Sequence, residues 1–166
     1  MNESKTYFTD TAKYYTLEKK RIVYGGGGIM PDVFVPLDTS SIKKDIRTII
    51  SKGVVNRFVI DYVDQNREYL QKKYRSFDVF KDRFPGDEPI MEKFNSHYKV
   101  ENSEKEFQLT EDGRKYILTL IKAYIARDIW GNNEFYQVYN QTEEEYTTAL
   151  NVLENWQSYL TKLHLK

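Results

Sequence analysis

The stretch RIVYGGGGIMPDVFVPLD, residues 21–38, holds four of the eight glycines in a chain of 166 residues. Such a run serves as a phosphate-binding loop, as a flexible linker, or as a constrained loop where a side chain would clash. A phosphate-binding loop is followed by a helix, whereas Pro31 and a strand-like segment follow here. Apolar Tyr24 and Ile29 at the two ends of the run argue against a linker. The residues therefore favour a constrained loop.

Short strands are predicted on both sides of the glycines. KYYTL at 13–17 and RIVYG at 21–25 are rich in β-forming residues and flank EKK, which predicts a hairpin with a three-residue loop. DVFVP at 32–36 has its two valines on one side and Phe34 on the other, and it ends in proline. This pattern predicts a short edge strand. Residues 1–38 are assigned to a β segment, with a glycine-rich connection at 25–28.

From Thr39 onward the apolar residues follow the helical period. Gly53 interrupts the first pattern, SFDVFKDRF and PIMEKFNSHY predict two short helices, and the long stripe after them stops near Gly131. The apolar positions are Ile42, Ile46, Ile49 and Ile50; Val55, Phe58, Val59, Tyr62 and Val63, continuing to about Tyr69; Ile117, Leu120, Ile121, Tyr124, Ile125 and Ile129; and Tyr146, Leu150, Leu153, Trp156, Tyr159, Leu160 and Leu163. The fold predicted is mainly α: a short N-terminal β-hairpin segment followed by a multi-helix bundle at 39–166.

Two capping boxes are predicted at helix starts. Ser103 with Glu106 precedes the long stripe, and Thr142 with Glu145 opens a single last helix.

Composition excludes several functional classes. Basic and acidic residues number 25 each, so the formal net charge is zero, and we expect no nucleic-acid partner because phosphate neutralisation needs a basic excess. The absence of cysteine excludes disulfides and thiolate chemistry. No apolar run approaches the roughly 20 residues of a membrane span, and residues 1–15 lack the apolar stretch of a signal peptide. We expect neither in this chain.

No catalytic residue, metal site or cofactor site is predicted. His97 and His164 lack metal-ligand spacing and are expected to be solvated surface histidines. The carboxylates of residues 143–145 suit a first helical turn. Ser51 and Lys52 are sequence neighbours on a helix, so their side chains diverge and make no nucleophile–base pair.

The segment YGGGGIMPD, residues 24–32, closely resembles a motif of the C-terminal processing (tail-specific) serine proteases, in the form found in the Bacteroidetes. The matching residues are Tyr24, Gly25, Gly26, Gly27, Gly28, Ile29, Pro31 and Asp32. The tyrosine-rich strand and basic turn before the motif and the stretch LIKAYIARDIWGNNEFYQVY at 120–139 are similar to the same family. The resemblance covers most of the chain, from about Tyr14 to Leu160.

The resemblance implies a non-catalytic C-terminal region. The family works through a Ser-Lys dyad and a PDZ domain, and the serine motif, the lysine motif and the PDZ domain do not occur in this chain. Residues 1–38 would then complete the protease core, and the glycines would join the edge of the catalytic sheet to a helical tail. Implied partners are the catalytic and PDZ domains, the protein substrates of the full-length enzyme, and a second copy bound through the C-terminal helices. The implied location of the full-length protein is the periplasm or cell envelope.

A second hypothesis from another class stays open. The chain would be a stand-alone helical protein-interaction module without protease activity.

Overall fold

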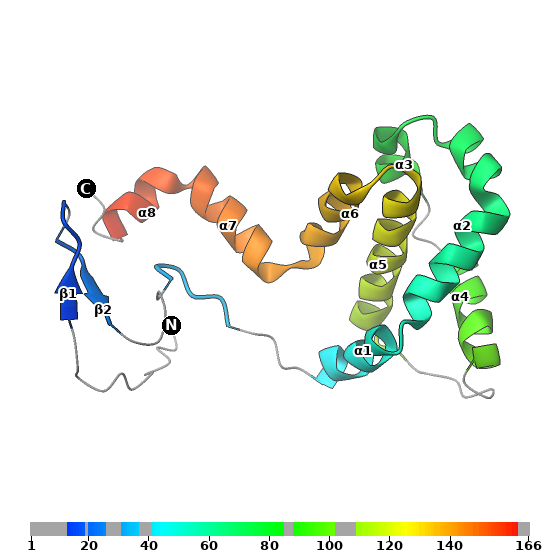
Figure 1. The fold of residues 1–166 in the computed structure, drawn as a ribbon, viewed down its shortest axis with the longest axis horizontal. Coiled ribbons are helices and arrows are strands. Elements are labelled where there is room, and N and C mark those ends of the chain that lie inside the picture. The colour runs from blue at the N-terminus through cyan, green and yellow to red at the C-terminus, as the bar shows by residue number, and fades with distance from the viewer. Residues whose placement is uncertain are drawn as a thin grey trace. The chain divides into compact units, whose positions relative to one another are not determined.

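The computed structural model of the chain describes residues 13–18, 20–25, 31–36, 41–84, 88–101 and 109–162. The described chain is mainly helical, with a two-stranded antiparallel sheet near its N-terminus (Figure 1). The predicted fold class is therefore confirmed.

The chain divides into two units, one comprising Met1–Pro36 with Asn151–Lys166 and the other Leu37–Leu150. The predicted role of the first 38 residues, completing a protease core, stays a prediction.

The predicted hairpin is present. Strand β1 (Lys13–Tyr15) pairs antiparallel with β2 (Ile22–Tyr24), so that Tyr14 lies opposite Val23. Beyond the strands, the Thr16 N–H donates to the Arg21 carbonyl at 2.9 Å, and the Arg21 N–H donates to the Thr16 hydroxyl at 3.0 Å. This extra pairing makes the loop the four residues 17–20 instead of the predicted three.

Residues 32–36 do not form the predicted edge strand. Val33 and Val35 are half-buried while Phe34 is 58% exposed, so the alternation is real. A strand also needs a neighbour to complete its hydrogen bonds, and the sheet in the described part of the chain contains only β1 and β2. The alternation of exposed and half-buried residues was therefore not enough to predict a strand at 32–36.

Most predicted helices occur where the period placed them. The helices are α1 (Ser41–Ser51), α2 (Val54–Lys73), α3 (Phe77–Arg83), α4 (Glu88–Glu101), α5 (Glu111–Ile129), α6 (Asn132–Tyr139), the short 3-10 turn η1 (Asn140–Thr142), α7 (Glu144–Glu154) and α8 (Trp156–Lys162). Gly53 separates α1 from α2 with a φ of +67°, a left-handed conformation that suits glycine. The Arg57 guanidinium donates to the Lys52 carbonyl at 2.8 Å and closes this corner.

Helix α5 lies at the centre of the second unit, where it packs against α1, α2 and α6 (Figure 1). Four residues of its predicted stripe are buried, and Tyr124 and Ile129 pack against the core from its edge. The buried four are Ile117, Leu120, Ile121 and Ile125. Thr110 caps the helix by accepting a hydrogen bond from the Gly113 N–H at 3.2 Å. The capping box predicted at Ser103 and Glu106 lies outside the described residues.

Helix α6 was not predicted. Gly131, with a φ of +138°, turns the chain back so that α6 packs along α5. Phe135 packs against Tyr124 of α5 with the rings tilted and their centroids 5.4 Å apart, and Val138 is buried. The hydroxyls of Tyr116 and Tyr139 lie 3.3 Å apart and tie the far end of α6 to α5.

This tie predicts a pH dependence of stability. Burial, then the Tyr116 hydrogen bond, raises the pKa of Tyr139 above its ordinary value of 10.0. The unfolded chain therefore loses this proton first, and the stabilisation, complete below pH 10.0, is lost as the pH rises further. We expect Tyr139→Phe to lose less unfolding free energy than wild type between about pH 9 and 11, by urea unfolding. The control is Tyr136→Phe, at an exposed ring of the same helix. Equal losses in wild type and Tyr139→Phe would contradict the expectation.

The single last helix predicted from Thr142 is two helices. Thr142 ends η1 and its hydroxyl donates to the Tyr139 carbonyl at 2.8 Å, so it does not form the predicted capping box. Helix α7 ends at Glu154 and α8 begins at Trp156. Between them, the Asn155 side chain donates to the Asn151 carbonyl at 3.0 Å, which competes with regular helix geometry.

Candidate functional site

The glycine motif is partly described. Its described residues are Tyr24, Gly25, Pro31 and Asp32, and the others, Gly26, Gly27, Gly28 and Ile29, lie outside the described residues. Arg21, just before β2, forms an ion pair with Asp32, the last residue of the motif. This contact links residues that flank the glycine run on its two sides. Both side chains are about two-fifths exposed, so the pair itself adds little stability.

His97 is not the solvated surface residue that was predicted. Its side chain is only 21% exposed, its ring packs edge-on against Phe58 at 5.6 Å, and its Nδ1 lies 4.0 Å from an Asp61 carboxylate oxygen. The period of α4 places it on the flank of the face that meets α2, which explains the burial. The other histidine, His164, lies outside the described residues.

The described residues contain no group of three or more histidine, cysteine or acidic side chains that could hold a metal ion.

Two other sets of residues considered in the sequence are also described. The Ser51 hydroxyl donates a hydrogen bond to the Thr48 carbonyl at 3.0 Å. Two of the three consecutive glutamates, Glu144 and Glu145, occupy the first turn of α7, as predicted. None of the helices in the described ranges is long and apolar enough to cross a membrane.

Among the described residues, Lys122 of α5 comes closest in character to a catalytic lysine base. Burial lowers the pKa of Lys122, and the nearby Asp82 carboxylate partly offsets this shift. The Lys122 ammonium donates a hydrogen bond to the Lys81 carbonyl of α3. Thr119 supplies the hydroxyl beside it, but this hydroxyl donates to the Lys115 carbonyl at 3.0 Å. The lysine thus ties α5 to α3, and the arrangement gives it no activated nucleophile.

Helix α7 exposes its apolar residues. Tyr146, Leu150 and Leu153 follow the i, i+4, i+7 spacing of one helix face, and Leu153 is 67% exposed. None of the residues of α7 is buried. Trp156, the first residue of α8, is also exposed. An exposed apolar row of this kind is typical of a surface that meets another protein.

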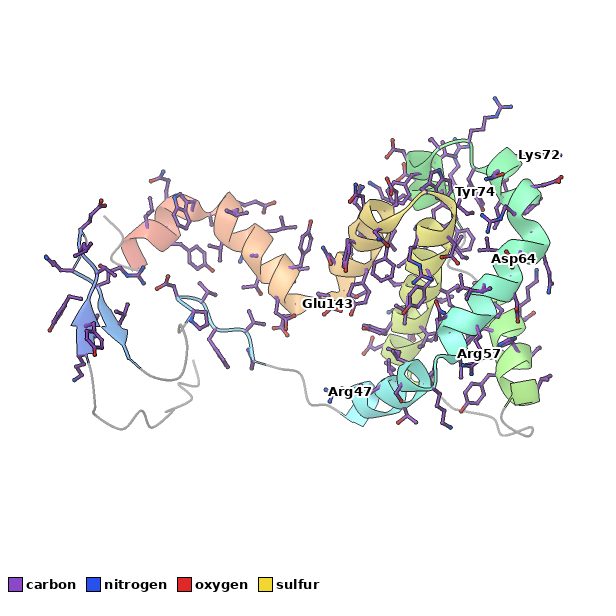
Figure 2. All side chains as sticks on the ribbon, viewed as in Figure 1. Arg47, Arg57, Asp64, Lys72, Tyr74 and Glu143 are labelled. Atoms are coloured by element: carbon purple, nitrogen blue, oxygen red, sulfur yellow. The ribbon has the colours of Figure 1, made fainter. Side chains whose placement is uncertain are left out.

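A second feature is a groove of about 420 Å³ between α2 and α4, which we call the lysine–tyrosine groove. Its floor is buried and largely apolar, and consists of Leu70, Tyr74, Phe84 and Ile90. Figure 2 shows Tyr74 where α2 ends and the chain turns toward α3. Phe58 of α2 and Phe94 of α4 pack edge-to-face at 5.3 Å and hold these two helices together.

The rim of the groove carries two lysines held against tyrosine rings. The Lys73 ammonium lies 3.0 Å from the Tyr69 hydroxyl and 5.3 Å from the Tyr69 and Tyr74 ring centroids. Its hydrogen bond to Tyr69, followed by that to Tyr74, raises the pKa of Lys73, so this side chain is charged at neutral pH. On α4, the Lys93 ammonium lies 5.2 Å from the Tyr62 ring. Such cation–π contacts each contribute about 0.5–1 kcal/mol at exposed positions.

Sequence reasoning missed this groove. The spacing of Tyr69 and Lys73, four residues apart on one helix, was the only local signal. Lys93 enters the site from another helix, and only the packing of α4 on α2 brings it there.

The described helices carry two candidate binding surfaces, the α7 face and the lysine–tyrosine groove. The chain belongs to a family of unknown function, DUF8443, which matches residues 46–131. The match runs from the middle of α1 to the end of α5 and includes the groove. No curated protein and no solved structure is significantly similar to the chain.

Proposed function

We propose that this chain is a non-catalytic helical domain that mediates protein assembly, and that it forms the C-terminal region of a tail-specific protease. The exposed apolar face of α7 is the observation that carries the assembly role. Burying a leucine that would otherwise meet water contributes about 1.5–3 kcal/mol. Leu150, Leu153 and Trp156 would therefore supply a substantial part of the binding energy of an interface.

The occupant that we propose for this face is a second copy of the chain. A closed dimer is the commonest way for a single apolar patch to become buried. The zero net charge of the chain imposes no overall repulsion between two copies. Tryptophan is also among the residues that contribute most at protein interfaces.

The protease assignment is supported by the glycine motif. It is also compatible with the ion pair of Arg21 and Asp32, which links the two sides of the glycine run.

Two measurements on the native protein test the protease assignment. An antibody raised against this chain should capture a longer polypeptide from the source cells. Tryptic peptides of that polypeptide should include the serine motif and sequences from a PDZ domain. The purified chain alone should not cleave unfolded protein, because oxyanion stabilisation and binding without a nucleophile leave little rate. Capture of a polypeptide lacking those peptides would contradict the assignment.

The stand-alone interaction module remains the second candidate, because the same α7 face supports it. The stand-alone hypothesis predicts that the captured polypeptide carries no protease sequence. It also predicts that the chain still associates with a second copy of itself. The capture experiment therefore separates the two hypotheses.

A further inference from the structure

We propose that the lysine–tyrosine groove binds a small aromatic anion, such as an aromatic carboxylate. The groove lies within the family-matched residues, and this binding is independent of the α7 face and of the protease assignment. A volume of about 420 Å³ falls in the range of small-molecule sites.

The charges of the groove favour an anion. Lys73 approaches it from α2 and Lys93 from α4, and none of the side chains that the structure describes in its lining is acidic. Both ammonium groups lie on tyrosine rings, and the Lys73 ammonium also lies within hydrogen-bond distance of the Tyr69 hydroxyl. The two cations are thus held near the groove and remain available to a carboxylate.

The walls favour a flat, unsaturated body attached to that anion. Tyr62 and Tyr69 line the rim, and Tyr74 lies in the floor with the apolar side chains of Leu70 and Ile90. Aromatic rings prefer stacked or edge-to-face partners, and burial of a ring against this floor contributes hydrophobic energy. Asn66, whose side-chain amide donates to the Tyr62 carbonyl at 2.8 Å, retains a polar oxygen at the rim.

A charge-matched neighbour provides the control. Lys72 precedes Lys73 but lies 3.8 Å from Glu68 and is 82% exposed. Figure 2 shows it projecting from α2 away from the bundle. Removing its charge changes the net charge as much as removing that of Lys73, without touching the groove.

The test is a titration of the ¹⁵N-labelled chain with 2-naphthoate, followed by amide chemical shifts. We expect saturable shifts at residues of α2 and α4 that line the groove. Lys73→Met and Lys93→Met should each raise the Kd about tenfold, as expected for loss of a charge-assisted contact. Lys72→Met should leave the Kd unchanged. The neutral isostere 2-naphthamide should bind wild type about tenfold more weakly than 2-naphthoate.

Three results would overturn the proposal. They are the absence of saturable shifts at millimolar 2-naphthoate, equal affinity for 2-naphthamide, and an equal loss of affinity in Lys72→Met and Lys73→Met. The comparison of 2-naphthoate with 2-naphthamide uses only the wild-type chain. It therefore tests the preference of the groove for an anion even if a variant misfolds.

Discussion

Replacing Phe80 with alanine is expected to lower the free energy of unfolding by about 3–5 kcal/mol, a large share of the 5–15 kcal/mol typical of a domain. Phe80 of α3 is fully buried. Its ring lies 4.7 Å from that of Phe84, 5.0 Å from Trp130 and 5.3 Å from Tyr74. The substitution removes aromatic contacts to Phe84 at the end of the same helix, and to Tyr74 and Trp130 at the ends of α2 and α5. It leaves a cavity that rigid helices fill poorly.

Urea unfolding followed by circular dichroism measures this loss. Phe34→Ala is the matched control, because the same side chain is removed from a 58% exposed position and the change should be under about 0.5 kcal/mol. Comparable losses in the two variants would show that α3 does not anchor the end of α5 as described.

The helices of the bundle were predictable because their apolar residues repeat with the helical period. Val55, Phe58, Val59 and Val63 are buried on one face of α2, as their spacing indicates. Gly53 was predictable as a break because glycine favours the left-handed conformation that it adopts.

Other elements depend on partners that the local sequence does not contain. Helix α6 is rich in aromatic residues with weak helix preference, and its position depends on packing of Phe135 against Tyr124. The segment 32–36 has the alternation of a strand, but no strand in the described part of the chain pairs with it. Asn155 interrupts the last helix through a side-chain contact that the apolar period does not register.

The two candidate sites differ in how far the sequence could reveal them. The apolar spacing of α7 was visible in the sequence, and only the structure shows that the face is exposed. The lysine–tyrosine groove requires α2 and α4 to meet, with Lys73 and Lys93 on facing elements. No pattern within one helix contains that information.

The residues matched by the family include only one of the two candidate binding surfaces. Residues 46–131 contain the groove, whereas the glycine motif and α7 lie outside them. A small-molecule site would therefore concern the family region, and the assembly role would concern the segments that flank it.

Leu153→Glu is expected to abolish self-association. The leucine is 67% exposed on α7, so the substitution should spare the fold while placing a charge in the apolar contact. Val100→Glu is the matched control, because Val100 is an exposed apolar residue at the end of α4. Circular dichroism of each variant establishes that the helices are retained.

Light scattering of the purified chain over about 10–100 µM tests the assembly role most directly. The account predicts that wild type and Val100→Glu reach twice the 19.8 kDa mass of one chain, while Leu153→Glu stays at 19.8 kDa. A wild-type chain that is monomeric throughout this range, or a Leu153→Glu variant that dimerises as wild type does, would contradict it.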